Sequence, residues 1–153
     1  MLTLLRDLRR LRKSIALGRP DRGRSLAVRP VDAGSCNGCE HELILASSPY
    51  TDLQRFGIGV VASPRHADLL LVTGPVTTRM REPLLTAYAA MPEPRLVVAL
   101  GDCALGCNVL GRDEDLVGPV ESLLPVDARI PGCPPNPDAI AAALLELLDS
   151  RPS

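Results

Sequence analysis

The chain has 153 residues, of which 46% are hydrophobic, and this size suits one compact domain and is too short for two. Aromatic residues make up only 2%, so the core must consist mainly of Leu, Val, Ala and Ile, and nucleic-acid modules that stack bases on aromatic side chains are disfavoured. No apolar run reaches the roughly 18 to 20 residues that cross a bilayer, so we expect no membrane-spanning helix.

The first 29 residues are strongly basic. They contain nine Arg or Lys and two Asp, a net charge of +7, and since the whole chain carries −1, the remainder carries −8. Apolar residues recur at helical spacing among these charges, which predicts a short basic amphipathic helix and linker over residues 1–25. The helix has two open interpretations: it lies on an anionic membrane beside membrane subunits of a complex, or it docks onto another subunit or forms a disordered arm. Nothing else in the chain supports binding of nucleic acid.

The N-terminal segment does not read as an export signal. A twin arginine is present at Arg9 and Arg10, but only Ser14 to Leu17 precede Gly18, far short of the roughly 7 to 15 apolar residues that an export signal needs. We therefore expect a cytoplasmic protein. Five cysteines in such a chain indicate metal or redox chemistry, because the cytosol keeps thiols reduced.

From residue 26 onward, short apolar runs alternate with helical stretches. Strands are expected at 26–28, 58–62, 69–73, 95–100 and 126–130, and helices at 40–46, 82–90 and 137–148. The first strand is the weakest of these predictions, because Arg29 and Pro30 interrupt it before Val31. The last helix is the best delimited, with Asn136 as its cap and Pro137 in its first turn. The alternation predicts an α/β fold, with a parallel sheet flanked by helices.

Four of the cysteines follow the ends of predicted strands. Cys36 and Cys39 follow the first strand, Cys103 the fourth and Cys133 the fifth. In a parallel α/β sheet the carboxyl ends of the strands meet at one edge, where ligands bind. We therefore expect the four thiols to lie close together.

The stretch from Cys36 to Cys39 is a CxxC motif that could bind one zinc ion or two irons of a cluster. Gly38 allows the backbone to fold so that amide N–H groups point at sulfur. A CxxC that opens a helix also occurs in thioredoxin-type dithiols, and in that case Cys103 and Cys133 would have no chemical role.

Cys103 and Cys133 lie in tight loops rich in Gly and Pro, and core packing requires a cysteine in neither. Four thiolates can complete either a zinc site or a [4Fe-4S] site. Structural zinc usually gathers paired CxxC motifs, whereas two ligands here would be single residues from distant loops. The spacing therefore favours one [4Fe-4S] cluster held by Cys36, Cys39, Cys103 and Cys133.

Three segments, DAGSCNGCE, GDCALG and PGCPPNP, carry a resemblance to a known family. In this order they resemble the family that includes the small subunits of [NiFe] hydrogenases and their counterpart in NADH:quinone oxidoreductase (respiratory complex I). The likeness covers about residues 26–150. It implies a flavodoxin-like fold for this domain and one [4Fe-4S] cluster close to the active site of a larger partner subunit.

Within that family the first motif discriminates. The complex I counterpart has adjacent cysteines as its first pair, while hydrogenase small subunits have CxxC, as this chain does. The chain also lacks the additional cysteine-rich region of uptake hydrogenases, and so it resembles the membrane-bound, energy-converting hydrogenases of the formate hydrogenlyase type.

The resemblance implies an electron-transfer subunit of an oxidoreductase that itself makes and breaks no substrate bonds. Its partners would be a hydrogenase-type large catalytic subunit, a ferredoxin-like iron–sulfur subunit and membrane subunits, with the complex on the cytoplasmic face of the membrane. Two alternatives stay open: the same cluster role in a nickel-free quinone oxidoreductase, and a zinc or dithiol redox adaptor.

Other residues near the motifs have weaker interpretations. Cys107 stands where relatives commonly have glycine, and we expect a small buried residue beside the cluster, with an alternative ligand or a redox-sensitive thiol left open. Glu40, His41 and Glu42 could carry protons or tune a cluster facing the partner's active site, or they form a solvated first helical turn. The segment 74–78 lacks the spacing of a phosphate loop, so we predict no nucleotide site.

Overall fold

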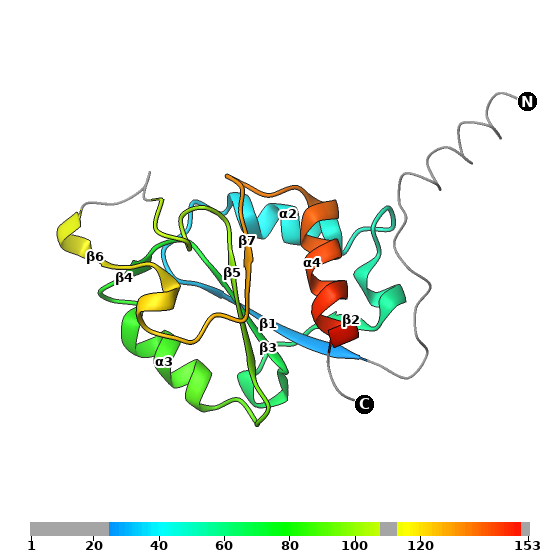
Figure 1. Ribbon diagram of the computed structural model, residues 1–153, viewed down its shortest axis with the longest axis horizontal. Coiled ribbons are helices and arrows are strands. Elements are labelled where there is room, and N and C mark those ends of the chain that lie inside the picture. Colours follow the sequence, from blue (N-terminus) through cyan, green and yellow to red (C-terminus); the bar gives the residue numbers. More distant parts are fainter. Residues whose placement is uncertain (1–24, 108–112, 151–153) are drawn as a thin grey trace, which may run out of the picture.

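The computed structural model describes residues 25–107 and 113–150 (Figure 1). The predicted basic N-terminal helix lies almost entirely outside these residues. No helix in the described part of the chain is both long and apolar enough to cross a membrane.

Five parallel strands form the central sheet. They are β1 (Leu26–Asp32), β2 (Ile58–Val60), β3 (Leu69–Thr73), β5 (Leu96–Leu100) and β7 (Ala128–Ile130). Their spatial order is β2-β1-β3-β5-β7, and every neighbouring pair is parallel. Taken in chain order, this is the 2-1-3-4-5 arrangement of flavodoxin-like folds. The predicted α/β class and flavodoxin-like sheet are confirmed.

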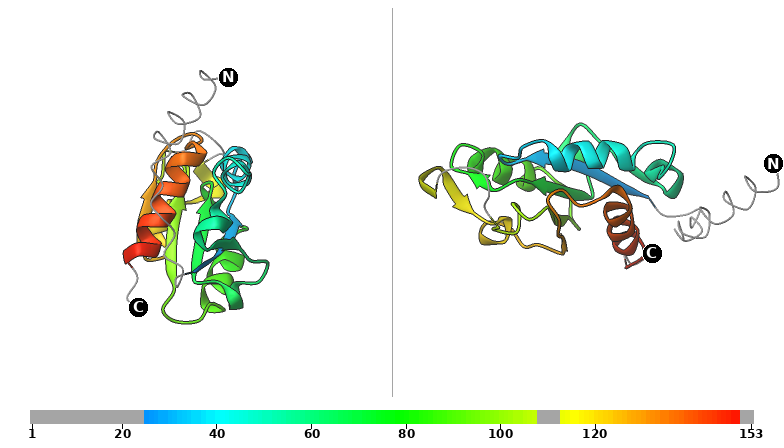
Figure 2. Two further views of the ribbon diagram at one scale, coloured as in Figure 1. Left: turned by 90° about the vertical axis from the view of Figure 1, so that its right-hand side faces the viewer. Right: turned by 90° about the horizontal axis from the view of Figure 1, so that it is seen from above.

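Helices cover both faces of the sheet (Figures 1 and 2). The helices are α2 (Gly38–Ala46), α3 (Arg81–Ala89) and α4 (Pro137–Ser150). Side chains of α2 and α4 pack with Leu69 and Leu71 of β3 on one face, while α3 packs with Leu70 and Val72 on the other. All five residues of β3 are therefore buried, which explains why its first four, Leu69 to Val72, form a continuous apolar run.

The first strand is longer than the sequence predicts, because it continues through Pro30 to Asp32. The N–H of Val61 donates to the carbonyl of Val28, so the backbone N–H and C=O of Val28 point toward β2. Because backbone groups alternate in direction along a strand, the backbone groups of Pro30, two residues on, also point to the β2 side. The β1–β2 pairing ends at Val28 and Val60. The missing N–H of proline is therefore not needed at position 30.

The other predicted elements agree with the structure within about two residues at each end. Two short strands, β4 (Val76–Thr77) and β6 (Leu116–Gly118), were not predicted and pair antiparallel in a second small sheet. Four 3₁₀ turns complete the described chain: η1 (Leu53–Phe56), η2 (Pro64–His66), η3 (Asp113–Asp115) and η4 (Val120–Ser122). Strands of two or three residues contain too few positions to show a pattern.

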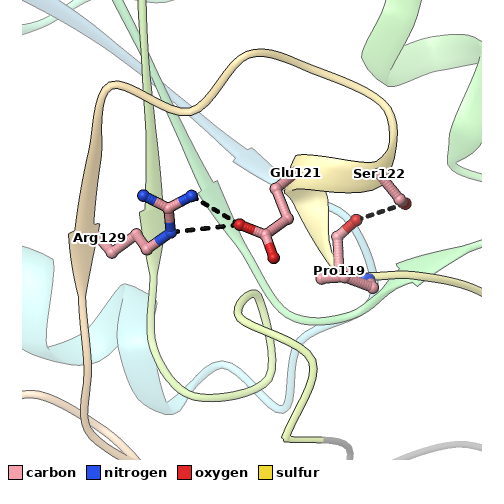
Figure 3. A network of polar contacts seen from close by, with 4 residues as sticks. All are labelled: Pro119, Glu121, Ser122 and Arg129. Carbon is pink, nitrogen blue, oxygen red and sulfur yellow. Dashed lines mark hydrogen bonds and ion pairs between the residues drawn. The ribbon is translucent and has the colours of Figure 1, made fainter.

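Polar side chains tie the loops to the sheet. Asp68 accepts a hydrogen bond from the N–H of Ala27, and Asp127 accepts one from the N–H of Val97, at 2.8 and 2.7 Å. On the surface, Arg129 of β7 donates from Nε and a terminal nitrogen to one carboxylate oxygen of Glu121 in η4 (Figure 3). Both partners of that pair are half exposed, so it contributes little to stability.

The packing of α4 can be tested with Leu144→Ala. Leu144 is fully buried against the sheet, so we expect the substitution to lower the free energy of unfolding by about 2–5 kcal/mol. Chemical denaturation measures the loss. Glu146→Ala, on the exposed side of the same helix, is the control and should change stability by roughly 0.5 kcal/mol or less. Equal losses would contradict the packing described.

Candidate metal centre

Four strands of the sheet end in a single row. Asp32 of β1 pairs with Thr73 of β3, Thr73 pairs with Leu100 of β5, and Leu100 pairs with Ile130 of β7. The loops that follow must therefore emerge side by side at one edge. Cys36, Cys39, Cys103 and Cys133 all lie in these loops or in the helix turn that continues the first of them.

The four predicted thiols line one cavity of about 120 Å³. Gly74, Asp102 and Gly132 contribute to the same wall. Cys103 is buried, Cys39 is partly buried, and Cys36 and Cys133 are exposed. The structure thus brings together all four residues that the sequence proposed, and it leaves two of them accessible at the surface of the edge.

The loop after β1 is shaped by its own polar side chains. Asp32 Oδ1 accepts hydrogen bonds from the N–H groups of Gly34 and Ser35, at 2.8 and 2.6 Å, and closes a tight turn. Ser35 Oγ accepts from the N–H of Asn37, which has a φ of +67° and precedes the first residue of α2. This turn starts the helix at once and places Cys39 in its first turn.

Asp102 joins the loops that carry Cys103 and Cys133. Its Oδ1 accepts from the N–H of Gly132 at 2.7 Å, and its own N–H donates to the carbonyl of Gly132 at 2.9 Å. The N–H of Gly101 donates to the carbonyl of Ile130 as well. These bonds extend the β5–β7 pairing past the ends of the strands, so the two thiols are held by one hydrogen-bonded unit.

Two glycines permit close approach at this edge. A Cβ on Gly101 would lie 2.5 Å from Cys39 Sγ, and a Cβ on Gly74 would lie 2.4 Å from the backbone nitrogen of Ser35. Both residues have positive φ, +89° and +72°. Only glycine both fits the available space, because it has no Cβ, and readily adopts the positive φ at these positions.

The thiols interact electrostatically. Burial raises the pKa of Cys39 to about 12, and the carboxylate of Glu40 and the neighbouring Cys103, Cys36 and Cys133 act in the same direction. No residue lining the cavity in the described part of the chain is basic. Four thiolates at this edge would therefore need the positive charge of bound metal to offset their mutual repulsion.

The donor set and the space fit a group of several atoms. Thiolates are soft ligands that suit zinc or iron–sulfur clusters. A cavity of about 120 Å³ is well above the roughly 10–15 Å³ that a single water molecule requires, so the space admits a group of several atoms. Within residues 25–107 and 113–150, no group of three or more His, Cys, Asp or Glu side chains is arranged to hold a single metal ion.

Cys107 differs from the expectation. It is exposed rather than buried, and it does not line the cavity. Its N–H donates to the carbonyl of Asp102, which closes the loop. The prediction of a small buried residue beside the cluster was wrong, because the sequence gives no sign that this end of the loop is exposed.

The residues after the CxxC motif have separate environments. His41 is exposed, as expected of a solvated first turn, whereas Glu40 is partly buried and accepts hydrogen bonds at Oε1 from the hydroxyls of Ser35 and Thr73. Sequence reasoning did not single out Thr73. It is one of two buried polar residues in the described chain. Threonine is common in strands, so its presence at the end of an apolar strand gives no sign of a functional role.

Comparison with known families gives one matching model. Residues 36–147 match the family described as NADH ubiquinone oxidoreductase, 20 Kd subunit. The matched region begins at Cys36 and includes all four thiols that line the cavity.

Individual proteins are similar over most of the chain. The probable membrane-bound hydrogenase subunit mbhJ of Pyrococcus furiosus is 44% identical over 94% of this chain and 86% of that protein. Formate hydrogenlyase subunit 7 of Escherichia coli is 47% identical over 84% of this chain and 51% of that protein. Among solved structures, a chain of the archaeal membrane-bound sulfane sulfur reductase, a respiratory membrane complex, has a TM-score of 0.71 and 31% identity, covering 84% of this chain and 71% of that chain.

The close approach at Gly101 can be tested with Gly101→Ala. The new methyl group would collide with Cys39 Sγ, and the positive φ would strain alanine by about 1–3 kcal/mol, so we expect a loss of stability of at least that size. Gly59→Ala is the matched control, because a Cβ there meets no atom within 4 Å. Urea denaturation compares the two variants, and equal stability would show that Gly101 does not constrain Cys39.

Proposed function

Because the chain belongs to the family of the NADH ubiquinone oxidoreductase 20 Kd subunit, we propose that it is the electron-transfer small subunit of a complex I-related, hydrogenase-type oxidoreductase. The observation that carries the proposal is the set of four thiols lining one cavity at the carboxyl edge of the sheet. The hydrogenase subunits among its relatives support the assignment to the hydrogenase type.

In this proposal Cys36, Cys39, Cys103 and Cys133 hold one [4Fe-4S] cluster. When bound, such a cluster supplies one-electron redox chemistry at a potential set by solvent exposure and hydrogen bonds to sulfur. The rest of the edge holds the ligands in place: Asp102 joins two of the loops, and the glycines allow the thiols to approach. The chain itself makes and breaks no substrate bonds.

In this proposal another subunit covers the two exposed thiols, Cys36 and Cys133. We assign this role to a large catalytic subunit, which would exchange electrons with the cluster, while a ferredoxin-like subunit would connect it to the donor or acceptor. Residues 26–150 form the cluster-binding domain in this proposal. The basic segment 1–25 would contact membrane subunits on the cytoplasmic face, which fits its net positive charge but lies almost wholly outside the described residues.

A second candidate keeps the cluster and changes the reaction of the complex. The similar chain from a sulfane sulfur reductase belongs to a complex that is named for a different chemistry from hydrogen conversion. The same small subunit could therefore serve a nickel-free oxidoreductase, including one that reduces quinone. The large subunit, and not this chain, would distinguish the two.

Serine substitutions test the ligand set. We expect Cys36→Ser and Cys133→Ser each to lower the iron content by up to about four irons per complex, because these clusters are held by cysteine thiolates and a serine hydroxyl is a much poorer ligand for iron. The complex is purified without oxygen through a tag on this chain, and its iron is counted. Cys107→Ser is the control and should keep the full iron content, because Cys107 does not line the cavity. Full iron in either of the first two variants would remove that residue from the set.

The other metals in the same preparation separate the candidate functions. Nickel together with iron is expected of the hydrogenase-type complex, and iron without nickel would favour the second candidate. Zinc in place of iron, or no metal at all, would contradict both and support a zinc-binding or dithiol adaptor.

A further inference from the structure

The charged side chains at the thiol cavity are acidic. Apart from the thiols themselves, Asp102 is the one ionisable residue among the described residues that line the cavity. Glu40, which directly follows Cys39, adds a second carboxylate, and its charge acts on the Cys39 thiol. A group bound in this cavity would therefore be surrounded by negative charge from the protein as well as from its own ligands.

Asp102 is close in the chain to two of the proposed ligands. It directly precedes Cys103, and its Oδ1 accepts a hydrogen bond at 2.7 Å from the N–H of Gly132, which directly precedes Cys133. The side chain is partly buried, so salt and solvent screen its charge less than they screen a charge on the open surface. Asp102 is therefore placed to act on both thiols.

The loops at this edge also use their backbone N–H groups internally. The N–H of Gly132 donates to Asp102, and the N–H groups of residues 104–107 donate to carbonyl oxygens of their own loop. Pro134 and Pro135, which follow Cys133, have no N–H. Hydrogen bonds from N–H groups to sulfur stabilise the reduced, more negative form of an iron–sulfur cluster. Donors that are directed to oxygen do not provide that stabilisation.

We propose that Asp102 holds the reduction potential of a cluster in this cavity below the value it would have without this carboxylate. The inference rests on the proposed function, because it concerns the cluster that the four thiols would hold. One electron from the ferredoxin-like subunit would add one negative charge, with no bond formed or broken, and the fixed charge of Asp102 opposes that addition. Asp102 also keeps the N–H of Gly132 away from sulfur. It is thus a positioning residue that acts through the ligands.

Two substitutions separate the charge of Asp102 from its hydrogen bond. Asp102→Asn keeps an oxygen that accepts from the N–H of Gly132 but removes the charge, whereas Asp102→Ala removes both. If the charge sets the potential, both variants should raise it. If the carboxylate only joins the two loops, Asp102→Asn should behave as the wild type.

Asp127→Asn is the matched control. Asp127 also uses a carboxylate oxygen to accept from a backbone N–H, that of Val97, at 2.7 Å. Asp127 precedes β7 and Val97 lies near the start of β5, so this bond is at the opposite end of the two strands from Asp102 and does not line the cavity. The two strands run side by side in Figure 1 and in Figure 2. The control removes the same charge without changing the surroundings of the thiols.

The tagged complex is purified without oxygen, titrated with a reductant and followed by electron paramagnetic resonance. The signal that Cys36→Ser removes is assigned to this chain. We expect Asp102→Asn to raise the ratio of reduced to oxidised cluster about tenfold at a fixed potential, which is about 59 mV for one electron. A unit charge acting over roughly 10 Å at an effective dielectric constant of about 20 has this effect. Asp102→Ala should shift the ratio at least as far, and Asp127→Asn should match the wild type.

The iron content of each preparation completes the test, and it should be equal in the wild type, Asp102→Asn and Asp127→Asn. An unchanged potential in Asp102→Asn with full iron would overturn the proposal. So would equal shifts in Asp102→Asn and Asp127→Asn, because they would show a response to the net charge of the chain. Loss of iron from Asp102→Asn would show that the carboxylate holds the loops and does not set the potential. Absence of iron from the wild type would instead contradict the proposed function, so the two failures are distinguishable.

Discussion

The register of the parallel sheet determines the site. Because Asp32, Thr73, Leu100 and Ile130 pair across β1, β3, β5 and β7, four strands end in one row and the loops after them are neighbours. A shift of any one of these strands would carry its loop along the strand direction and separate the thiols. Packing of the apolar strands against the helices on both faces fixes this register. The geometry of the site therefore depends on the same interactions that stabilise the core.

The loops turn this common edge into a binding site. Asp32 and Asp102 use carboxylate oxygens to hold backbone N–H groups, while Gly74 and Gly101 leave space for the neighbouring loop and for the thiol of Cys39. The result is a cavity that gathers four thiols and no basic side chain among its lining residues. Such a site opposes its own ionisation, as the raised pKa of Cys39 shows, and bound iron would relieve this repulsion.

Much of this arrangement follows from local sequence. The cap of α4 was predictable because Asn136 has the right side chain at the right position, and its Oδ1 accepts from the N–H of Ala139. The grouping of the cysteines was predictable because parallel strands share a carboxyl edge. Features that depend on three-dimensional neighbours could not be predicted in this way. Whether β1 can contain Pro30 depends on where β2 ends, and the exposure of Cys107 depends on how its loop folds. The role of Thr73 depends on Glu40, which is distant in the sequence.

The central claim is that the four thiols at this edge hold an iron–sulfur cluster. It is tested most directly by anomalous X-ray scattering from crystals of the complex grown without oxygen, with data collected on both sides of the iron absorption edge. The proposal predicts a compact group of iron peaks among Cys36, Cys39, Cys103 and Cys133. A single peak at the zinc edge, or no anomalous signal at this position in an intact complex, would contradict it.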